Sequence, residues 1–152
     1  MRQPNADADV VILGCVRSKA LGPARAKDLY VSPLWRKRRA FAEASGRPWV
    51  IFSAKHGILD PDEVIEWYDV ALAKLPTMER QRKGRAAVSQ LEHRFGTLRG
   101  MTFEIHAGSA YAGALAVPLA ERGAMLVNPL EGLSIGYQLQ WYGPRRSGNN
   151  DR

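Results

Sequence analysis

The fold is decided by a short stretch near the start of the chain, Asp9-Val10-Val11-Ile12-Leu13-Gly14-Cys15. Its apolar residues do not alternate with polar ones, which is typical of a strand that is buried on both faces of a parallel sheet. Three later runs have a similar character and predict further strands, at 49–53, 101–106 and 124–127. The sequence therefore predicts four strands, the first of which ends at Cys15.

Helical segments separate these strands. Ser32-Pro33 combines a hydroxyl N-cap with a proline in the first turn, and it predicts a helix over 33–45. Thr77 is expected to cap a helix over 78–95, while segment 54–76 is expected to be irregular, with a helical turn at 62–67. Two more helices are predicted over 108–122 and 132–141.

The alternation of strand and helix predicts an α/β fold. We expect one three-layer domain over residues 1–152, with a mainly parallel, four-stranded, Rossmann-like sheet between helices. The polar ends, 1–8 and 143–152, are expected to be flexible tails.

Composition narrows the class of protein. The 152 residues include a single cysteine and carry a net charge of +7. No run is long enough to span a membrane, and one cysteine cannot form an internal disulfide, so a cytoplasmic protein is predicted. The excess of cations, clustered at 36–39 and 80–85, is compatible with DNA or RNA as a partner, or with a solvated basic surface. Neither a Walker loop nor a GxGxxG motif is present, and no cofactor, metal site or oligomeric state is predicted.

Polar residues follow all four predicted strands. The carboxyl ends of parallel strands meet at one edge of an open sheet, where ligands bind close to a topological switch. We therefore expect the loops that carry Lys19, Lys55, His106 and Glu131 to surround one shared cavity. The four polar segments are 15–19, 53–57, 106–109 and 128–132.

Anion binding is expected at two places in these loops. Arg17, Lys19 and Lys55, with Ser18 between the first two, suit a phosphate or carboxylate, although they are also compatible with exposed loop charges. Gly108 and Ser109 open a helix whose free amides provide a second anion site, unless the glycine only serves the turn.

Three residues are candidates for catalysis. Glu131 is a candidate general base or nucleophile at a sugar carbon, against the alternative of a carboxylate that stabilises a helix start. His56 is a candidate for proton transfer, against a hydrogen-bonded histidine in a turn. Cys15 is a candidate nucleophile, against small core filling. Two further residue sets are candidates for binding: His106, whose alternative is structural, and Tyr68-Asp69, which would contact a base or anchor the loop.

The sequence resembles an uncharacterised domain family of bacteria and phages over nearly its whole length. The matching stretches are 15–19, 26–34, 53–61, 68–69 and 129–133. More distantly, the order of features is similar to the peroxide-stress protein YaaA, including a tyrosine element like 107–111, which adds Tyr111 to the binding candidates. Cys15, Lys19, Tyr68 and Asp69 resemble the catalytic region of archaeosine synthase, which modifies a deazaguanine base in tRNA. The YaaA resemblance implies DNA binding and a response to oxidative damage.

These observations favour an enzyme that acts on a nucleobase, nucleotide or modified base, by cleavage of the glycosidic bond or by base transfer. The alternative is a non-catalytic, YaaA-like nucleic-acid-binding protein of a DNA-damage or oxidative-stress response. A third possibility is an enzyme that acts on an acidic small molecule without any nucleic acid.

Overall fold

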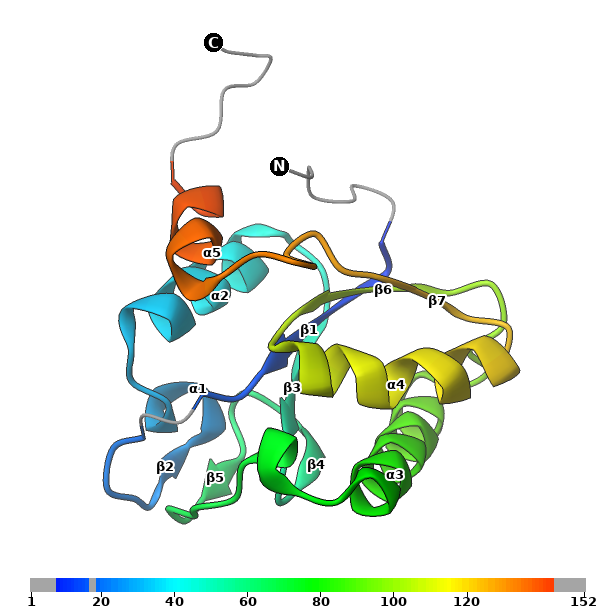
Figure 1. The fold of residues 1–152 in the computed structure, drawn as a ribbon, viewed down its shortest axis with the longest axis horizontal. Helices are drawn as coiled ribbons and strands as arrows, with labels where there is room; N and C mark the ends of the chain where they lie inside the picture. Colours follow the sequence, from blue (N-terminus) through cyan, green and yellow to red (C-terminus); the bar gives the residue numbers. More distant parts are fainter. Residues whose placement is uncertain (1–7, 17–18, 144–152) are drawn as a thin grey trace, which may run out of the picture.

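The computed structural model describes residues 8–16 and 19–143 of the chain (Figure 1). A five-stranded sheet has the order β4-β3-β1-β6-β7. Its strands are β1 (Val10–Gly14), β3 (Trp49–Ser53), β4 (Gly57–Leu59), β6 (Thr102–His106) and β7 (Met125–Val127). The helices that flank it are α2 (Pro33–Ala44), α3 (Thr77–Phe95), α4 (Ser109–Glu121) and α5 (Ile135–Trp141). The predicted tails lie almost entirely outside the described residues.

The first strand is the centre of the sheet, as its apolar sequence predicts. All five residues of β1 are buried. It pairs in parallel with β3 on one side, where Ile12 lies opposite Val50, and with β6 on the other, where Ile12 lies opposite Ile105. Strand β7 adds to β6, again in parallel.

Alternate residues of β1 face two different layers of the core. Val10 and Ile12 pack with the apolar faces of α3 and α4. Val11 and Leu13 pack on the opposite face with residues of α2 such as Trp35. Figure 1 shows α3 and α4 on one side of the strands, and α2 and α5 on the other. The structure therefore confirms a mixed α/β fold with a mostly parallel sheet between helices.

The predicted number of strands is wrong, because β4 is a fifth strand in the segment expected to be irregular. It runs antiparallel to β3, with Ser53 opposite Gly57. Gly57 has a φ of +75°, a conformation that glycine adopts without strain and that allows the chain to reverse over three residues. A tight turn of this kind leaves too little alternating sequence for a strand to be recognised.

The predicted helical turn at 62–67 is also wrong. This part of the chain contains β5 (Val64–Ile65), which pairs with β2 (Ala24–Arg25) in a small antiparallel sheet. The carbonyl oxygens of Pro61 and Glu63 accept hydrogen bonds from amides of α1 (Ala26–Leu29), at 2.9 and 2.7 Å. These distant partners decide the backbone conformation, and local sequence does not report them.

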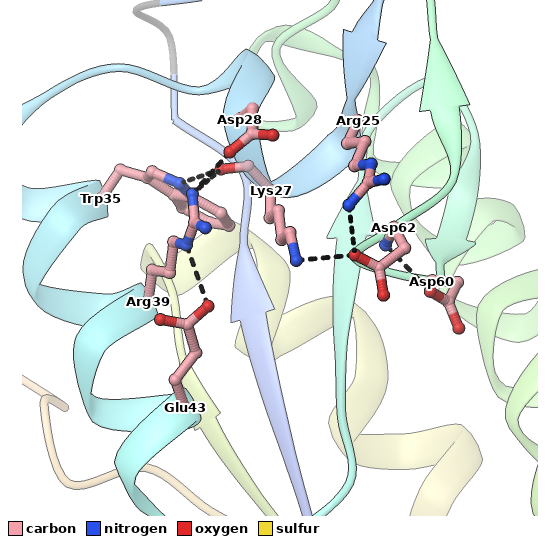
Figure 2. Close-up of polar contacts among 8 residues, drawn as sticks. All are labelled: Arg25, Lys27, Asp28, Trp35, Arg39, Glu43, Asp60 and Asp62. Atoms are coloured by element: carbon pink, nitrogen blue, oxygen red, sulfur yellow. Dashed lines mark hydrogen bonds and ion pairs between the residues drawn. The ribbon is translucent and has the colours of Figure 1, made fainter.

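Polar contacts attach this small sheet and α1 to helix α2 (Figure 2). Trp35 and Arg39 both donate to the carbonyl oxygen of Lys27, at 3.0 and 3.2 Å. The ammonium group of Lys27 lies 2.6 Å from a carboxylate oxygen of Asp62. Lys27 therefore connects α1 both to α2 and to the turn that precedes β5.

The connections out of β1 and β3 place a topological switch beside β1. The chain leaves β1 through α2 to reach β3, then crosses through α3 to β6 on the other side of β1. The two strand ends are packed tightly, since a Cβ on Gly14 would lie 2.3 Å from the Cβ of Ala107. Open sheets of this kind bind ligands at such a switch, beyond the carboxyl ends of the strands.

Candidate functional site at the carboxyl ends of β1 and β6

The centre of the candidate site is a contact between Cys15 and Tyr111. Cys15 follows β1, and its amide donates to the carbonyl oxygen of Phe52 at 3.2 Å. Tyr111 is in the first turn of α4, and its hydroxyl lies 2.9 Å from the sulfur of Cys15. Burial, followed by the proximity of Cys15, raises the pKa of Tyr111 above its ordinary value. The phenol therefore stays neutral at physiological pH and can donate a hydrogen bond to a thiolate.

Two cavities meet at this pair. The Lys19 cavity, of about 480 Å³, is lined by Cys15, Val16, Lys19, Tyr111 and residues 69–75. The Arg38 cavity, of about 510 Å³, shares Cys15, Val16 and Tyr111 with the first and adds Arg38, Gly108 and residues of α2 and α5. Each volume is within the range of about 300–1,000 Å³ that small-molecule sites occupy.

A buried hydroxyl network lies next to Lys19. The hydroxyl of Tyr68 lies 2.5 Å from that of Tyr30 and accepts a hydrogen bond from Ser53 at 2.9 Å. Burial is the main cause that raises the pKa of both tyrosines, so both remain neutral phenols. The ammonium group of Lys19 lies 4.8 Å from the ring centroid of Tyr68. The network therefore fixes the position of a cation rather than offering Tyr68 as an open stacking surface.

The loop after β3 contributes indirectly. The amides of Lys55 and His56 both donate to the hydroxyl oxygen of Ser53, at 3.2 and 3.1 Å. The side chain of Lys55 is exposed, while the ring of His56 packs edge-on against Tyr68 with centroids 5.3 Å apart. Burial, followed by the charge of Lys55, lowers the pKa of His56. Neither side chain lines the two cavities.

His106 belongs to a separate buried cluster. It is fully buried, and its Nε2 lies 2.7 Å from a carboxylate oxygen of Glu104, while its Nδ1 lies 2.5 Å from the hydroxyl of Tyr142. Its ring also packs against Phe41 of α2 and Trp141 of α5. These contacts place His106 between the sheet and the α2–α5 layer, a position that favours its structural alternative.

Glu131 lines a third cavity, of about 860 Å³, between α4 and the segment that leads to α5. Ser109 lines this third cavity, and its neighbour Gly108 lines the Arg38 cavity. The expectation that Lys19, Lys55, His106 and Glu131 surround one cavity is therefore wrong. The carboxyl ends of the strands do meet, but the side chains after them diverge to both faces of the sheet.

The remaining sequence candidates divide between these places. Asp69 lines the Lys19 cavity with an exposed side chain. Lys74, which the sequence analysis did not select, lines the same cavity. Arg17 and Ser18 lie outside the described residues.

The two basic clusters are partly engaged within the protein. In the first, Arg38 is buried, and Arg39 pairs with Asp28 at 2.8 Å and with Glu43 at 3.1 Å. In the second, Arg80 donates to the carbonyl oxygen of Leu75, and Arg82 pairs with Glu79. The four remaining cations, Arg36, Lys37, Lys83 and Arg85, lie on α2 and α3, which cover opposite faces of the sheet.

The described residues contain neither a candidate membrane span nor a candidate metal site. No helix of the described residues is long and apolar enough to cross a membrane. Within residues 8–16 and 19–143, no group of three or more His, Cys, Asp or Glu side chains is arranged to hold a metal ion.

Comparison with known proteins gives a family and no activity. Over 50 residues the chain is 46% identical to the "Uncharacterized protein YfjM" of Bacillus subtilis (strain 168), a match that covers 32% of this chain and 33% of that protein. The matched part is thus about a third of the length of this curated relative. No solved protein structure matches, so the predicted Rossmann-like character stays a prediction.

Of the three resemblances predicted from the sequence, one is supported by comparison with known families. It supports the predicted likeness to an uncharacterised domain family and gives no support to a likeness to YaaA or archaeosine synthase. Residues 10–144 match a "Family of unknown function (DUF6884)", and the chain therefore belongs to that family.

Proposed function

We propose that the chain is an enzyme that acts on a nucleobase, nucleotide or modified nucleic-acid base, with the reacting atom next to Cys15. The observation that carries the proposal is the meeting of two cavities at the Cys15–Tyr111 pair, beyond the carboxyl end of the central strand. Together the cavities offer room for a base on one side of the thiol and for a sugar or phosphate on the other.

The residues around the thiol suit nucleophilic chemistry. Cys15 is 7% exposed and borders both cavities, so a bound substrate would reach its sulfur. The hydroxyl of Tyr111 lies within hydrogen-bond distance of the sulfur, and Lys19 and Lys74 line the same cavity as Cys15. Attack of the Cys15 sulfur on the sugar carbon would form a carbon–sulfur bond and break the glycosidic bond, so that the base leaves and takes up a proton. Water or a second base would then displace the sulfur and restore the thiol.

The Lys19 cavity has the composition of a base-binding site. Its walls are largely apolar, from Val70 to Leu75, and the carboxylate of Asp69 is available to accept hydrogen bonds from a base edge. Roles for His56 and Glu131 in proton transfer stay predictions.

The direct test is a screen for base release or base exchange. Nucleotides, nucleosides and modified RNA or DNA would be incubated with the protein, and free bases would be separated by chromatography. We expect turnover that is lost in Cys15→Ala and reduced in Tyr111→Phe. Tyr137→Phe serves as the matched control for Tyr111→Phe, because Tyr137 is exposed and lines neither cavity. Absence of turnover on every substrate class, or full activity of Cys15→Ala, would contradict the proposal.

A further inference from the structure

We propose that the Arg38 cavity is the subsite for a phosphate monoester, with the guanidinium group of Arg38 as its charged contact. That the ligand is a nucleotide rests on the proposed function. The new step is that the phosphate of this nucleotide binds in the Arg38 cavity.

Arg38 is a buried cation that has only neutral partners. It is 3% exposed in the middle of α2. Its Nη1 donates to the carbonyl oxygen of Gly14 at 3.1 Å, and its Nη2 donates to the side-chain oxygen of Gln138 at 3.3 Å. Its Nε is buried and has no hydrogen-bond partner, and no carboxylate of the described residues forms an ion pair with it.

An arrangement of this kind is unfavourable unless an anion completes it. An arginine side chain stays protonated in proteins, and a buried charge costs several kcal/mol when no opposite charge compensates it. The neighbouring Arg39 shows the ordinary arrangement, with two carboxylates at its guanidinium group. Arg38 lines the Arg38 cavity, so a positive charge without an ion-pair partner borders that cavity.

Two helices begin at the same cavity and add to its positive potential. Ser32 and Pro33, at the start of the 12-residue helix α2, line it, and so does Gly108, the N-cap of the 13-residue helix α4. At α2, Pro33 has no amide hydrogen and the amide of Trp35 already donates to the hydroxyl oxygen of Ser32 at 3.0 Å. The start of α4 has no side-chain cap, and its first amides favour an anion. Gly108 would leave space for a close approach, because a Cβ there meets no atom within 4 Å.

The position relative to Cys15 makes this a substrate subsite. Arg38 bonds to the carbonyl oxygen of Gly14, the residue that precedes Cys15, and Cys15 and Tyr111 line the same cavity. A phosphate bound by Arg38 would leave the sugar of a nucleotide beside the thiol and direct the base into the Lys19 cavity. A phosphate monoester fits better than a carboxylate, since it has enough oxygens to contact both the guanidinium group and the α4 amides.

The test measures binding of three classes of probe to the full chain by calorimetry: the four common ribonucleoside 5′-monophosphates, the matching nucleosides, and inorganic phosphate. The variant is Arg38→Met, which keeps the length of the side chain and removes its charge. Arg36→Met on the exposed face of the same helix is the matched control. We expect at least one monophosphate to bind about 10- to 100-fold more tightly than its nucleoside, and we expect Arg38→Met alone to abolish that difference.

The outcomes separate the subsite from the proposed function. Phosphate binding that depends on Arg38, without any preference for nucleotides, would leave the subsite standing and overturn the nucleotide assignment. Nucleotide binding that Arg38→Met and Arg36→Met affect equally would overturn the subsite and leave the function standing. If Arg38→Met does not fold, amide NMR of the unaltered protein decides. A shift of the Gly108 and Ser109 resonances on addition of phosphate supports the subsite, and unshifted resonances overturn it.

Discussion

The close approach of β1 and β6 at the site predicts that Gly14→Ala destabilises the protein. An added Cβ would lie 2.3 Å from the Cβ and 3.0 Å from the Cα of Ala107, so the two strand ends must separate. Overpacking of this kind costs about 1–3 kcal/mol, and the replacement of a glycine returns about 0.4–1 kcal/mol through the unfolded chain. The net loss of unfolding free energy should be about 0.5–2 kcal/mol, equivalent to a melting temperature lowered by about 1–8 °C.

Thermal and urea unfolding would measure this loss in Gly14→Ala and in two comparison variants. Ala107→Gly removes the closest clashing atom, so the double variant should recover at least about 0.5 kcal/mol relative to the sum of the single changes. Gly113→Ala on α4, where a Cβ meets nothing within 4 Å, should be neutral or stabilising. If Gly14→Ala melts at the temperature of the parent, or if the effects of Gly14→Ala and Ala107→Gly are simply additive, the Cβ atoms at these two positions do not clash as the structure predicts.

Three further predictions concern side chains around the site. Tyr68→Phe should lower the unfolding free energy by about 1–3 kcal/mol in urea, because it removes the hydrogen bonds that the buried hydroxyls of Tyr30 and Ser53 make to Tyr68; a loss below about 0.3 kcal/mol would contradict the network. The pKa of His56 is lowered in the folded state, so the unfolded chain binds more protons and stability should fall as the pH drops below the ordinary value of 6.5. His56→Gln should flatten this dependence between pH 7.5 and 5, and an unchanged slope would count against the assignment. Glu104→Ala should destabilise by about 3–5 kcal/mol, measured by chemical unfolding, since it removes the carboxylate that contacts buried His106; an effect below about 1 kcal/mol would show the contact to be dispensable.

The fold was largely predictable because its signals are local. The apolar run of β1, the Ser32-Pro33 helix start and the spacing of the later strands each reflect a short stretch of chain, and the structure confirms them. Strand β4 was not predictable in the same way, because three residues after a glycine turn become a strand only when β3 is beside them. The pair β2–β5 depends likewise on a partner about 40 residues away.

The site was only half predictable. The switch-point rule predicts a site at the end of β1, where Cys15 and Tyr111 are in contact and line one cavity with Lys19, and a ligand site there stays a prediction. It does not say to which face of the sheet each following side chain turns, and for this reason His106 and Glu131 were wrongly placed with Lys19. Arg38 was hidden among neighbouring basic residues, although its spacing from Trp35 and Ala42 places it on the buried face of α2. Glu104 had a similar signal, two residues before His106 on the same face of β6.

The meeting of the Lys19 and Arg38 cavities at one thiol is most directly tested by the alkylation rate of Cys15. The chain has a single cysteine, so intact mass after iodoacetamide treatment reports this position alone. A nucleoside monophosphate at saturating concentration should slow the modification about tenfold or more, because the bound molecule would cover the sulfur. Tight binding of the nucleotide with an unchanged alkylation rate would place the ligand elsewhere on the protein.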